Sequence, residues 1–414
     1  MSSTNVSRHR RQTAAAHRNQ GDPAWLSAVA GLCASLVGLG LARFAYTPVI
    51  PALIAAKWFS PADAVYLGAA NLAGYLAGAL VARELGARVG AVRTLRGMMV
   101  VASLCCLACS MPVSFIWFFA WRFLAGVTGG VIMVLAASTI LPHIAPSKRG
   151  LVGGVIFAGV GLGVAASGTL VPLLLQQGLR QSWYALGLLS ALLTLVSWKA
   201  WPAEPPATER APESHVSARG PRLTLVRVLS AQYGLNALAL VPHMIFLVDF
   251  VARGLGQGIT AGSHYWVLYG IGATVGPLLT GHLADRAGFR PALRVSFLVE
   301  AIAILLPVFS SAPATLIISS TVIGGFTPGI VPLVLGRIHE LLPHSNSSQR
   351  AAWAQATTMF ALFQAGGAYG LSYLFQRTGG DYTVLFVIGA GAVAASLAID
   401  LITARTVGRG RKPS

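Results

Sequence analysis

The stretch of the chain that decides the fold is Gly281-His-Leu-Ala-Asp285-Arg286-Ala-Gly288-Phe-Arg290, a charged turn between two long apolar runs. Gly281 comes four residues before Asp285, so a helix would place both on nearly one face, where the glycine leaves room for a neighbouring helix. Gly288 supplies the left-handed residue that ends the helix. Asp285 then lies in the last turn, where the macrodipole disfavours a carboxylate by about 0.3–1 kcal/mol. It therefore needs a positive partner, which could be Arg286, Arg290 or the N-terminus of another helix, and the pair would form a latch at one membrane face.

The composition is that of a polytopic membrane protein. Of its 414 residues, 55% are hydrophobic and 10% are charged, against roughly 25% charged in a soluble domain. The net charge of +18 lies mostly in short segments between apolar runs. It forms no aromatic-laced basic face, so we expect no nucleic-acid partner. The cysteines lie inside apolar runs and predict packing roles, with no disulfide framework and no metal site; they are Cys33, Cys105, Cys106 and Cys109.

Apolar runs long enough to cross a bilayer, which takes about 20 residues as helix, recur twelve times in two sets of six. Helix is the only sensible conformation, because a lipid-facing segment must satisfy its own backbone. The sequence thus predicts an all-α membrane protein with twelve transmembrane helices. The runs are 25–56, 62–82, 97–112, 113–141, 150–176 and 182–201, then 223–252, 261–284, 291–310, 313–342, 350–376 and 381–404.

The runs and the segments between them divide the chain into five parts. Arg10-Arg11 before the first run invites a twin-arginine export signal, but that run is too long for one, so we expect an uncleaved first span. The parts are a disordered basic tail (1–22), a six-helix half (23–201), a flexible proline-rich linker (202–222), a second six-helix half (223–404) and a basic tail (405–414).

The distribution of Lys and Arg predicts the topology. With the N-terminus in the cytoplasm, 24 of these residues fall on the cytoplasmic side and four on the other. Positive charge collects on the inner side of membrane proteins. We therefore expect a bacterial inner-membrane protein with both termini in the cytoplasm.

The two halves also repeat each other. Pro142, His143 and Arg149 follow the fourth run, and the same three residue types recur 201 residues later, after the tenth. The first-half copy of the loop stretch is decayed, with Ala82 where the second half has Asp285. These offsets predict a parallel repeat of two six-helix units.

Three motifs carry a resemblance to a known family. The loop stretch matches all five positions of G-x-x-x-D-R-x-G-x-R and resembles the cytoplasmic loop signature of the major facilitator superfamily. The run from Gly38 to Pro51, G-x-G-x-x-R-F-A-Y-T-P-x-x-P, resembles the first helix of its YbfB/YjiJ-type branch. R-F-L-x-G at Arg122 resembles the superfamily's fourth-helix motif, whose arginine is implicated in ion coupling. The resemblance runs from Trp25 to Ala404 and implies solute transport by two halves that rock about a midplane site.

Two arginines lie well inside apolar runs, where insertion costs at least about 2.5–3.5 kcal/mol. Arg43 could face the central cavity and bind an anionic or strongly hydrogen-bond-accepting solute, or pair with a carboxylate that loads a proton. Alternatively, it fixes a kink by bonding to carbonyls freed by Pro48 and Pro51. Arg122 could carry coupling or only clamp helix packing. Both fall in the middle-to-outer part of the membrane, so they could share one cavity.

Two acidic residues are further candidates for coupling. Glu300 lies deepest, in the ninth helix, and could be the protonatable site; the alternatives are a structural pair with an arginine and a neutral buried acid. Asp249 has Arg253 four residues later, so an ion pair on the helix surface also explains it.

A polar stripe on the seventh helix could complete the solute site from the second half. A histidine ordinarily titrates in the physiological range, and Asn236 lies seven residues before His243 on the same face. Asn71 and Tyr75 form a similar stripe on the second helix, and Tyr46 belongs to the first-helix motif. Packing alone could equally satisfy the histidine.

These features favour a proton-linked secondary transporter of a small organic solute, anionic or neutral because the central charges are arginines. The chain has no P-loop lysine signature and no G-x-S-x-G elbow, so we expect no enzymatic activity and no cofactor, with the proton gradient as energy source. The bilayer and a small solute are the expected partners, and a monomer is expected. The alternatives are an efflux pump of the same fold and a non-transporting membrane sensor or scaffold.

Overall fold

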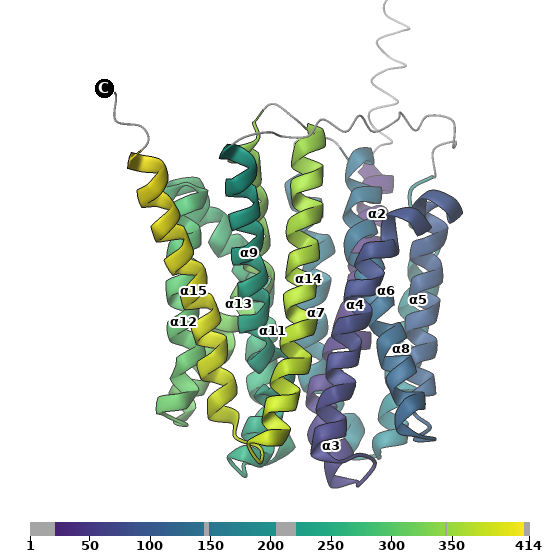
Figure 1. Cartoon of the computed structure of the whole chain (residues 1–414). Coiled ribbons are helices and arrows are strands. Elements are labelled where there is room, and N and C mark those ends of the chain that lie inside the picture. The colour runs from purple at the N-terminus through teal and green to yellow at the C-terminus, as the bar shows by residue number, and fades with distance from the viewer. Residues whose placement is uncertain (1–20, 145–148, 204–220, 344–345, 410–414) are drawn as a thin grey trace, which may run out of the picture.

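A computed structural model describes residues 21–144, 149–203, 221–343 and 346–409, and nearly all of them are helical. The predicted N-terminal tail and linker lie almost entirely outside these described residues, and the first half of the predicted C-terminal tail, 405–409, continues the last helix. Figure 1 shows long helices side by side, with the first half of the chain on one side and the second half on the other. α4 and α14 meet at the centre.

Twelve long helical spans appear at the places where the sequence predicts them. In the first half they are α2 (Gly21–Ser35) continued by η1 (Leu36–Phe44) and α3 (Tyr46–Ala55), then α4 (Pro61–Val89), α5 (Ala91–Ala108), α6 (Phe115–Ile140), α7 (Arg149–Leu175) and α8 (Leu179–Ser197). In the second half they are α9 (Pro221–Val241) continued by η5 (Pro242–Phe246), α10 (Leu247–Asp249) and η6 (Phe250–Gly254), then α11 (Gly258–Ala287), α12 (Phe289–Phe309), α13 (Pro313–Leu341), α14 (Asn346–Arg377) and α15 (Tyr382–Arg409).

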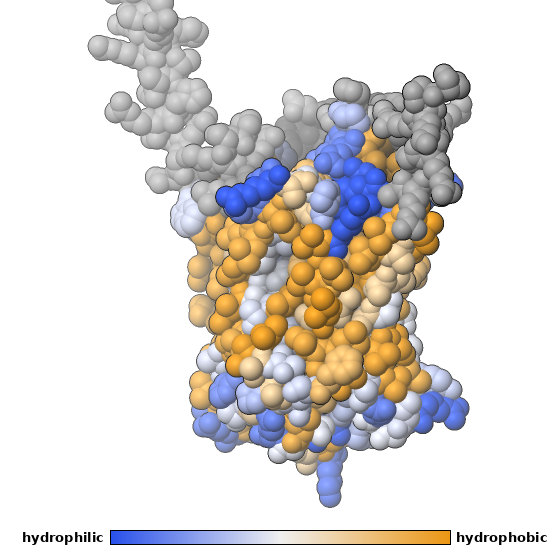
Figure 2. Space-filling view, turned by 90° about the vertical axis from the view of Figure 1, so that its left-hand side faces the viewer, coloured by the Kyte–Doolittle hydropathy of each residue, from blue (hydrophilic) through white to orange (hydrophobic). Residues whose placement is uncertain are grey.

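Ten of these spans, within the described residues, are long and apolar enough to cross a membrane. α8 and α14 are the two that fall short. α14 is rich in Gln, Ser and Thr, and α8 opens with Arg180, Gln181 and Ser182. Figure 2 shows a hydrophobic band between hydrophilic ends. The predicted all-helical membrane architecture is therefore observed, with two spans more polar than a lipid-facing helix.

Charge separates the two ends of the helix bundle. We call the end where α2 and α9 begin the basic end, the upper end in Figure 1, and the opposite end the far end. The far end carries Lys57, Arg180, Arg253 and Arg377. The basic end carries Arg83, Arg88, Arg93, Arg96, Arg286, Arg290, Arg294 and Arg337.

Local sequence signals set several helix ends. The Ser60 hydroxyl accepts a hydrogen bond from the Asp63 amide at 3.1 Å and caps α4, and Ser114 caps α6 in the same way. α11 ends at Ala287, and Gly288 follows with φ of +83°. A side chain would be strained there, so this glycine produces the turn between α11 and α12.

The first and seventh spans are interrupted by π-helical segments. η1 occupies the middle of the first span, and η5 and η6 flank a short α segment in the seventh. Pro51 lies inside α3, and Pro242 begins η5. Proline removes a backbone donor, and π segments mark positions where the helical ladder is disturbed, often at functional sites. η1 and η5 lie at the level of the site described below.

Glycines let α7 and α11 meet closely across the two halves of the chain. A Cβ added at Gly270 would come within 2.3 Å of the Ala165 amide nitrogen. One added at Gly168 would come within 2.8 Å of Val267. Both contacts lie between the middle of the bundle and the far end, so the two halves are closed against each other there.

Candidate functional site

Arg43 lies at the centre of the bundle and is only 7% exposed. η1 carries it, and its Nη2 donates a hydrogen bond to Gln364 Oε1 on α14 at 2.7 Å. Its guanidinium lies 4.6 Å from the ring centroid of Tyr75 and 5.1 Å from that of Phe44. Arg43 Nε has no hydrogen-bond partner among the described residues. The positive charge is thus held by a neutral amide and two aromatic rings.

Arg122, on α6, binds the backbone of the disturbed first span. Its Nη1 donates to the Ala42 carbonyl at 2.7 Å, and its Nη2 donates to the Arg43 carbonyl at 3.4 Å. The sequence left this carbonyl-binding role open for Arg43, but the structure gives it to Arg122. The Ala42 and Arg43 carbonyls are available to Arg122 because η1 is π-helical. The interaction therefore needs no proline next to Arg122 in the sequence.

Three other predicted residues gather around the two arginines. The Tyr46 ring centroid lies 4.2 Å from the Arg122 guanidinium, and the Tyr46 hydroxyl donates to the Ala64 carbonyl at 2.7 Å. Asn71 Nδ2 donates to the Arg122 carbonyl at 3.0 Å. Tyr75 lies against Arg43, as described above. The first-half candidates therefore form one cluster, which we call the arginine site.

The arginine site borders the second half of the chain. Thr47 Oγ1 donates to the Met244 carbonyl at 2.6 Å, and Gln364 Nε2 lies 3.4 Å from the Met244 sulfur. A cavity of about 20 Å³ lies between the arginines and Met244. This is room for about one water molecule, so a solute could enter only after the halves move.

Aromatic packing closes the site toward the far end. Phe44 lies 6.1 Å from Trp266 on α11, measured between ring centroids. Trp266 Nε1 donates to Ser167 Oγ on α7 at 3.0 Å, which ties the two halves together. Tyr66 and Tyr369 meet across α4 and α14 with centroids 6.3 Å apart. These contacts bury the arginine site from that end.

His243 belongs to the interior of the second half, away from Arg43. Its Nε2 lies 2.8 Å from Ser319 Oγ on α13, and Ser319 donates its only hydroxyl proton to the Ala303 carbonyl at 2.7 Å. Nε2 must then carry the imidazole proton, leaving Nδ1 as an acceptor without a partner among the described residues. The predicted contact with solute is thus replaced by packing against α13 and α15, because the side chain points away from the first half.

Asn236 also points into the second half, where it meets Glu300. Asn236 Nδ2 donates to Glu300 Oε2 at 2.6 Å, and both side chains are fully buried. Asn236 Oδ1 and Glu300 Oε1 have no partner among the described residues. Glu300 has no arginine partner there either. The pair joins α9 to α12 and lies outside the arginine site.

Asp249 is held at the far end. Arg253 Nε lies 2.5 Å from Asp249 Oδ1, and the Tyr382 hydroxyl donates to Asp249 Oδ2 at 2.6 Å. The ion pair with the residue four positions later is the alternative that the sequence offered, and Tyr382 extends it to α15. This cluster links η6 to α15 within the second half.

The loop stretch differs from its prediction in two respects. A Cβ at Gly281 would meet nothing within 4 Å, so no neighbouring helix packs there. Asp285 and Arg286 are exposed and, within the described part of the chain, form no hydrogen bond or ion pair. Arg290 pairs instead with Asp400 on α15, its Nε lying 3.3 Å from Oδ1. Arg290 is therefore engaged by α15 in this conformation, and the latch at Asp285 stays a prediction.

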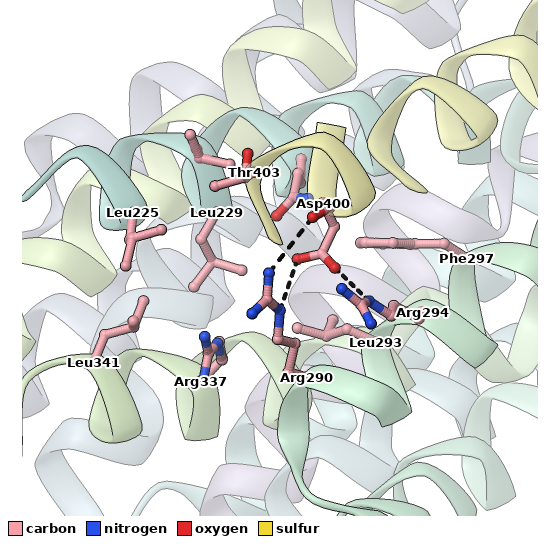
Figure 3. Close-up of a pocket in the computed structure, with 12 residues that line it drawn as sticks. Leu225, Leu229, Arg290, Leu293, Arg294, Phe297, Arg337, Leu341, Asp400 and Thr403 are labelled. Atoms are coloured by element: carbon pink, nitrogen blue, oxygen red, sulfur yellow. Dashed lines mark hydrogen bonds and ion pairs between the residues drawn. The ribbon is translucent and has the colours of Figure 1, made fainter. Parts of the chain in front are cut away.

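Asp400 and Gln364 are two residues that the sequence analysis missed. Asp400 also accepts from Arg294 Nε at 2.5 Å. Figure 3 shows Arg290 and Arg294 directed at this carboxylate, with Arg337 beside them. The available signal for Gln364 was an amide near the middle of a predicted span that is more polar than the others. For Asp400 the signal was an acid inside the last apolar run, close to the basic tail.

Comparison with known proteins agrees with this architecture. The structure aligns with the crystal structure of a mutant of the nucleoside transporter NupG, with a TM-score of 0.73 and 13% sequence identity. The alignment covers 91% of this chain and 99% of NupG. At that identity the likeness shows the fold alone. A search of curated proteins found no match.

The membrane-spanning helices make the chain a multi-pass integral membrane protein, and its sequence places it among transporters of the major facilitator type. The sequence model of the family described as "Uncharacterised MFS-type transporter YbfB" matches residues 35–401. The chain belongs to this family, as its first-helix motif predicted.

Proposed function

We propose that this protein is a proton-linked secondary transporter of a small organic solute, and that the solute is an anion or a strong hydrogen-bond acceptor bound by Arg43. One observation carries the proposal. Arg43 and Arg122 lie inside the membrane region, and neither pairs with a carboxylate among the described residues. A buried charge is costly unless it is paired. An anionic solute would supply the missing partner.

The hydrogen-bond inventory around Arg43 indicates where the solute would bind. Gln364 Oε1 accepts a hydrogen bond from Arg43 Nη2, and Arg43 Nε has no partner among the described residues. A carboxylate needs two parallel donors for its strongest binding to arginine. It would displace Gln364, and Phe44 and Tyr75 would pack against its organic part.

Alternating access supplies the mechanism. The contacts of Trp266, Tyr369 and Gly168 close the far end in this conformation. Rocking of the two halves would break these contacts and open the arginine site to the far end. Because Arg122 binds the Ala42 and Arg43 carbonyls, it would transmit a change in η1 to the solute anchor. Asp285, which has no partner in the part of the chain that the structure describes, would latch the basic end in the opposite conformation.

Glu300 is the proposed proton carrier. It is fully buried, and its carboxyl group has a neutral amide as its only partner among the described residues. A carboxyl group in such surroundings can exist in the neutral form, and its ionisation would alter the packing of α9 against α12. His243 is the second candidate for this role, since its Nδ1 could accept a proton.

The test is a thermal-shift screen of the purified protein against anionic, neutral and cationic metabolites, run beside Arg43→Gln. A solute at one hundred times its Kd should stabilise the parent protein by about 2.7 kcal/mol. Arg83→Gln, at an exposed position of the basic end, is the matched control. We expect anions to stabilise the parent and the control and not Arg43→Gln. Stabilisation of Arg43→Gln equal to that of the parent would refute the solute anchor.

A further inference from the structure

A polar pocket opens at the basic end of the second half, and the proposed solute site does not use it. It lies between α9, α12, α13 and α15, with Arg290, Arg294, Arg337 and Asp400 at its mouth. Leucines line its walls (Figure 3). Its volume of about 20 Å³ accommodates about one water molecule. The pocket therefore suits water and excludes an organic solute.

The floor of this pocket lies one helical turn from Glu300 and its partner. Gln232 and Phe297 line the pocket. Asn236 comes four residues after Gln232 on α9, and Glu300 comes three residues after Phe297 on α12. Residues three or four apart share a helix face. The hydrogen-bonded pair thus lies directly beneath the pocket, toward the middle of the membrane.

Buried polar atoms without partners occur on α9 and α12 next to the pocket lining and at the Asn236–Glu300 pair. Ser296 Oγ, Asn236 Oδ1 and Glu300 Oε1 are buried and have no hydrogen-bond partner among the described residues. Buried polar atoms are nearly always hydrogen-bonded, and internal water commonly supplies the missing bonds. Three such atoms beneath a water-sized pocket indicate a hydrated segment between the basic end and Glu300.

Three arginines and one aspartate line the mouth of the pocket, and Glu340 pairs with one of the arginines from outside it. Asp400 accepts from both Arg290 and Arg294, and Arg337 Nη1 lies 2.6 Å from Glu340 Oε2. Water there would meet both donors and acceptors.

We propose that this pocket and the three unpartnered atoms beneath it form a proton path from the basic end to Glu300, separate from the solute route through the arginine site. The step is a simple transfer. An O–H bond of a protonated water breaks, a new O–H bond forms at Glu300 Oε1, and a neutral water remains. The proposal rests on the proposed function only in taking Glu300 as the proton carrier.

The groups around Glu300 leave it as the acceptor at the inner end of this path. α12 packs against α11, α13 and α15, and Asn236 joins it to α9. His243 lies seven residues beyond Asn236, farther from the pocket, and bonds Ser319 through Nε2; Tyr269 bonds Thr327, and Tyr233 packs on Phe360. Among the side chains that the structure describes, the remaining titratable or charged groups on these elements lie toward their ends; they are Arg227, Arg253, His264, Tyr265, His282, Asp285, Arg286, Arg290, Arg294, Arg337, His339, Glu340, Tyr382 and Asp400, with Asp249 at the far end.

Infrared spectroscopy with hydrogen–deuterium exchange tests the path directly on the full-length protein. The carboxylic acid band of Glu300 is assigned by its loss in Glu300→Gln between pH 5 and 8, and its exchange rate is followed after transfer to D₂O. Gln232→Leu replaces the polar floor of the pocket with an apolar side chain. We expect it to slow exchange about tenfold, as when access requires a local opening.

The matched control makes the same substitution at the arginine site. Gln364→Leu should leave the exchange rate of Glu300 unchanged if the two routes are separate. Ser296→Ala, a smaller change that removes an unpartnered hydroxyl, should slow exchange even if Gln232→Leu folds poorly. The proposal is overturned if Gln364→Leu slows exchange as much as Gln232→Leu, if neither pocket variant slows it, or if no acid band disappears in Glu300→Gln.

The outcome is independent of solute binding. If the pocket variants leave exchange unchanged while Arg43→Gln abolishes binding of anions, the proton path fails and the transporter proposal stands. If Arg43→Gln binds anions normally, the exchange experiment still decides the path, because it requires no solute.

Discussion

At the scale of single residues, the two buried arginines have different roles. Arg43 is held by Gln364 and aromatic rings, and Arg122 is held by backbone carbonyls. The carbonyls that Arg122 binds belong to η1, whose ladder is disturbed. Arg122 therefore stabilises the fold of the first span, and Arg43 is free to exchange its amide partner for a solute.

This difference predicts that replacement by glutamine lowers the stability of the protein more at Arg122 than at Arg43. Arg122→Gln loses the bonds to the Ala42 and Arg43 carbonyls and should destabilise the protein by about 1.5–3 kcal/mol, the usual worth of hydrogen bonds to charged groups. Arg43→Gln loses one bond to a neutral amide and removes a buried unpaired charge. It should be less destabilised, or more stable than the parent. Thermal denaturation without added solute measures both, and equal losses would argue against the assignment.

Glu300→Gln separates coupling from transport. Glutamine has nearly the same shape and can still accept the hydrogen bond from Asn236, so the protein should fold. It cannot exchange a proton with the solution. We expect solute exchange across the membrane to continue and accumulation driven by a pH gradient to be lost, both measured in proteoliposomes. Gradient-driven accumulation by the variant would exclude Glu300 as the carrier.

The residue types and depths of the central cluster could be predicted from sequence, and their partners could not. Arg43, Arg122 and Glu300 were identified because they are charged residues within membrane spans. Such residues are unfavourable facing lipid and are found facing the interior of the helix bundle. Helical spacing alone placed His243 on one face with Asn236. It could not tell which neighbouring helix that face meets, and the structure turns it toward α12 and α13.

At the scale of helices, glycine contacts define the closed far end. α7 and α11 meet where Gly168 lies against Val267 and the Ser263 carbonyl. Helix spans were predictable because a hydrophobic run of bilayer length has one conformation. The π segments were not predicted, since a disturbance within an apolar run leaves its composition unchanged and the prolines show only that one is near.

Gly168→Val should open the far end. A Cβ there would lie within 2.8 Å of the Val267 side chain, so α7 and α11 must separate. The distance between spin labels at the exposed positions Lys57 and Arg377, one on each half, should increase, as measured by pulsed electron paramagnetic resonance. Gly97→Val on α5 is the control, because a Cβ at Gly97 meets nothing within 4 Å. An unchanged distance in Gly168→Val would contradict the role of this contact.

At the scale of the whole molecule, the far end is closed in this conformation. We therefore expect the latch at the basic end to form in the opposite conformation, in which the far end is open. Asp285 is exposed and, among the described residues, unpaired here. Asp285→Asn should therefore leave thermal stability within about 0.5 kcal/mol of the parent, as surface changes do, and still reduce the transport rate. A normal rate in counterflow would show that Asp285 latches nothing.

Charge at the two ends sets the expected orientation in the membrane. The basic end should face the cytoplasm, because cytoplasmic loops retain Lys and Arg. The proton path inferred for the second half would then start in the cytoplasm, and the arginine site would alternate between the two faces.

Counterflow with Arg43→Gln tests the central claim most directly. Proteoliposomes are loaded with an anion that stabilises the parent protein and are diluted into labelled anion, beside vesicles that carry Arg83→Gln. The account predicts transient accumulation of label by the parent and the control, and none by Arg43→Gln at equal protein content. Accumulation by Arg43→Gln at the parental rate would contradict it, because the solute would then cross the membrane without the buried guanidinium.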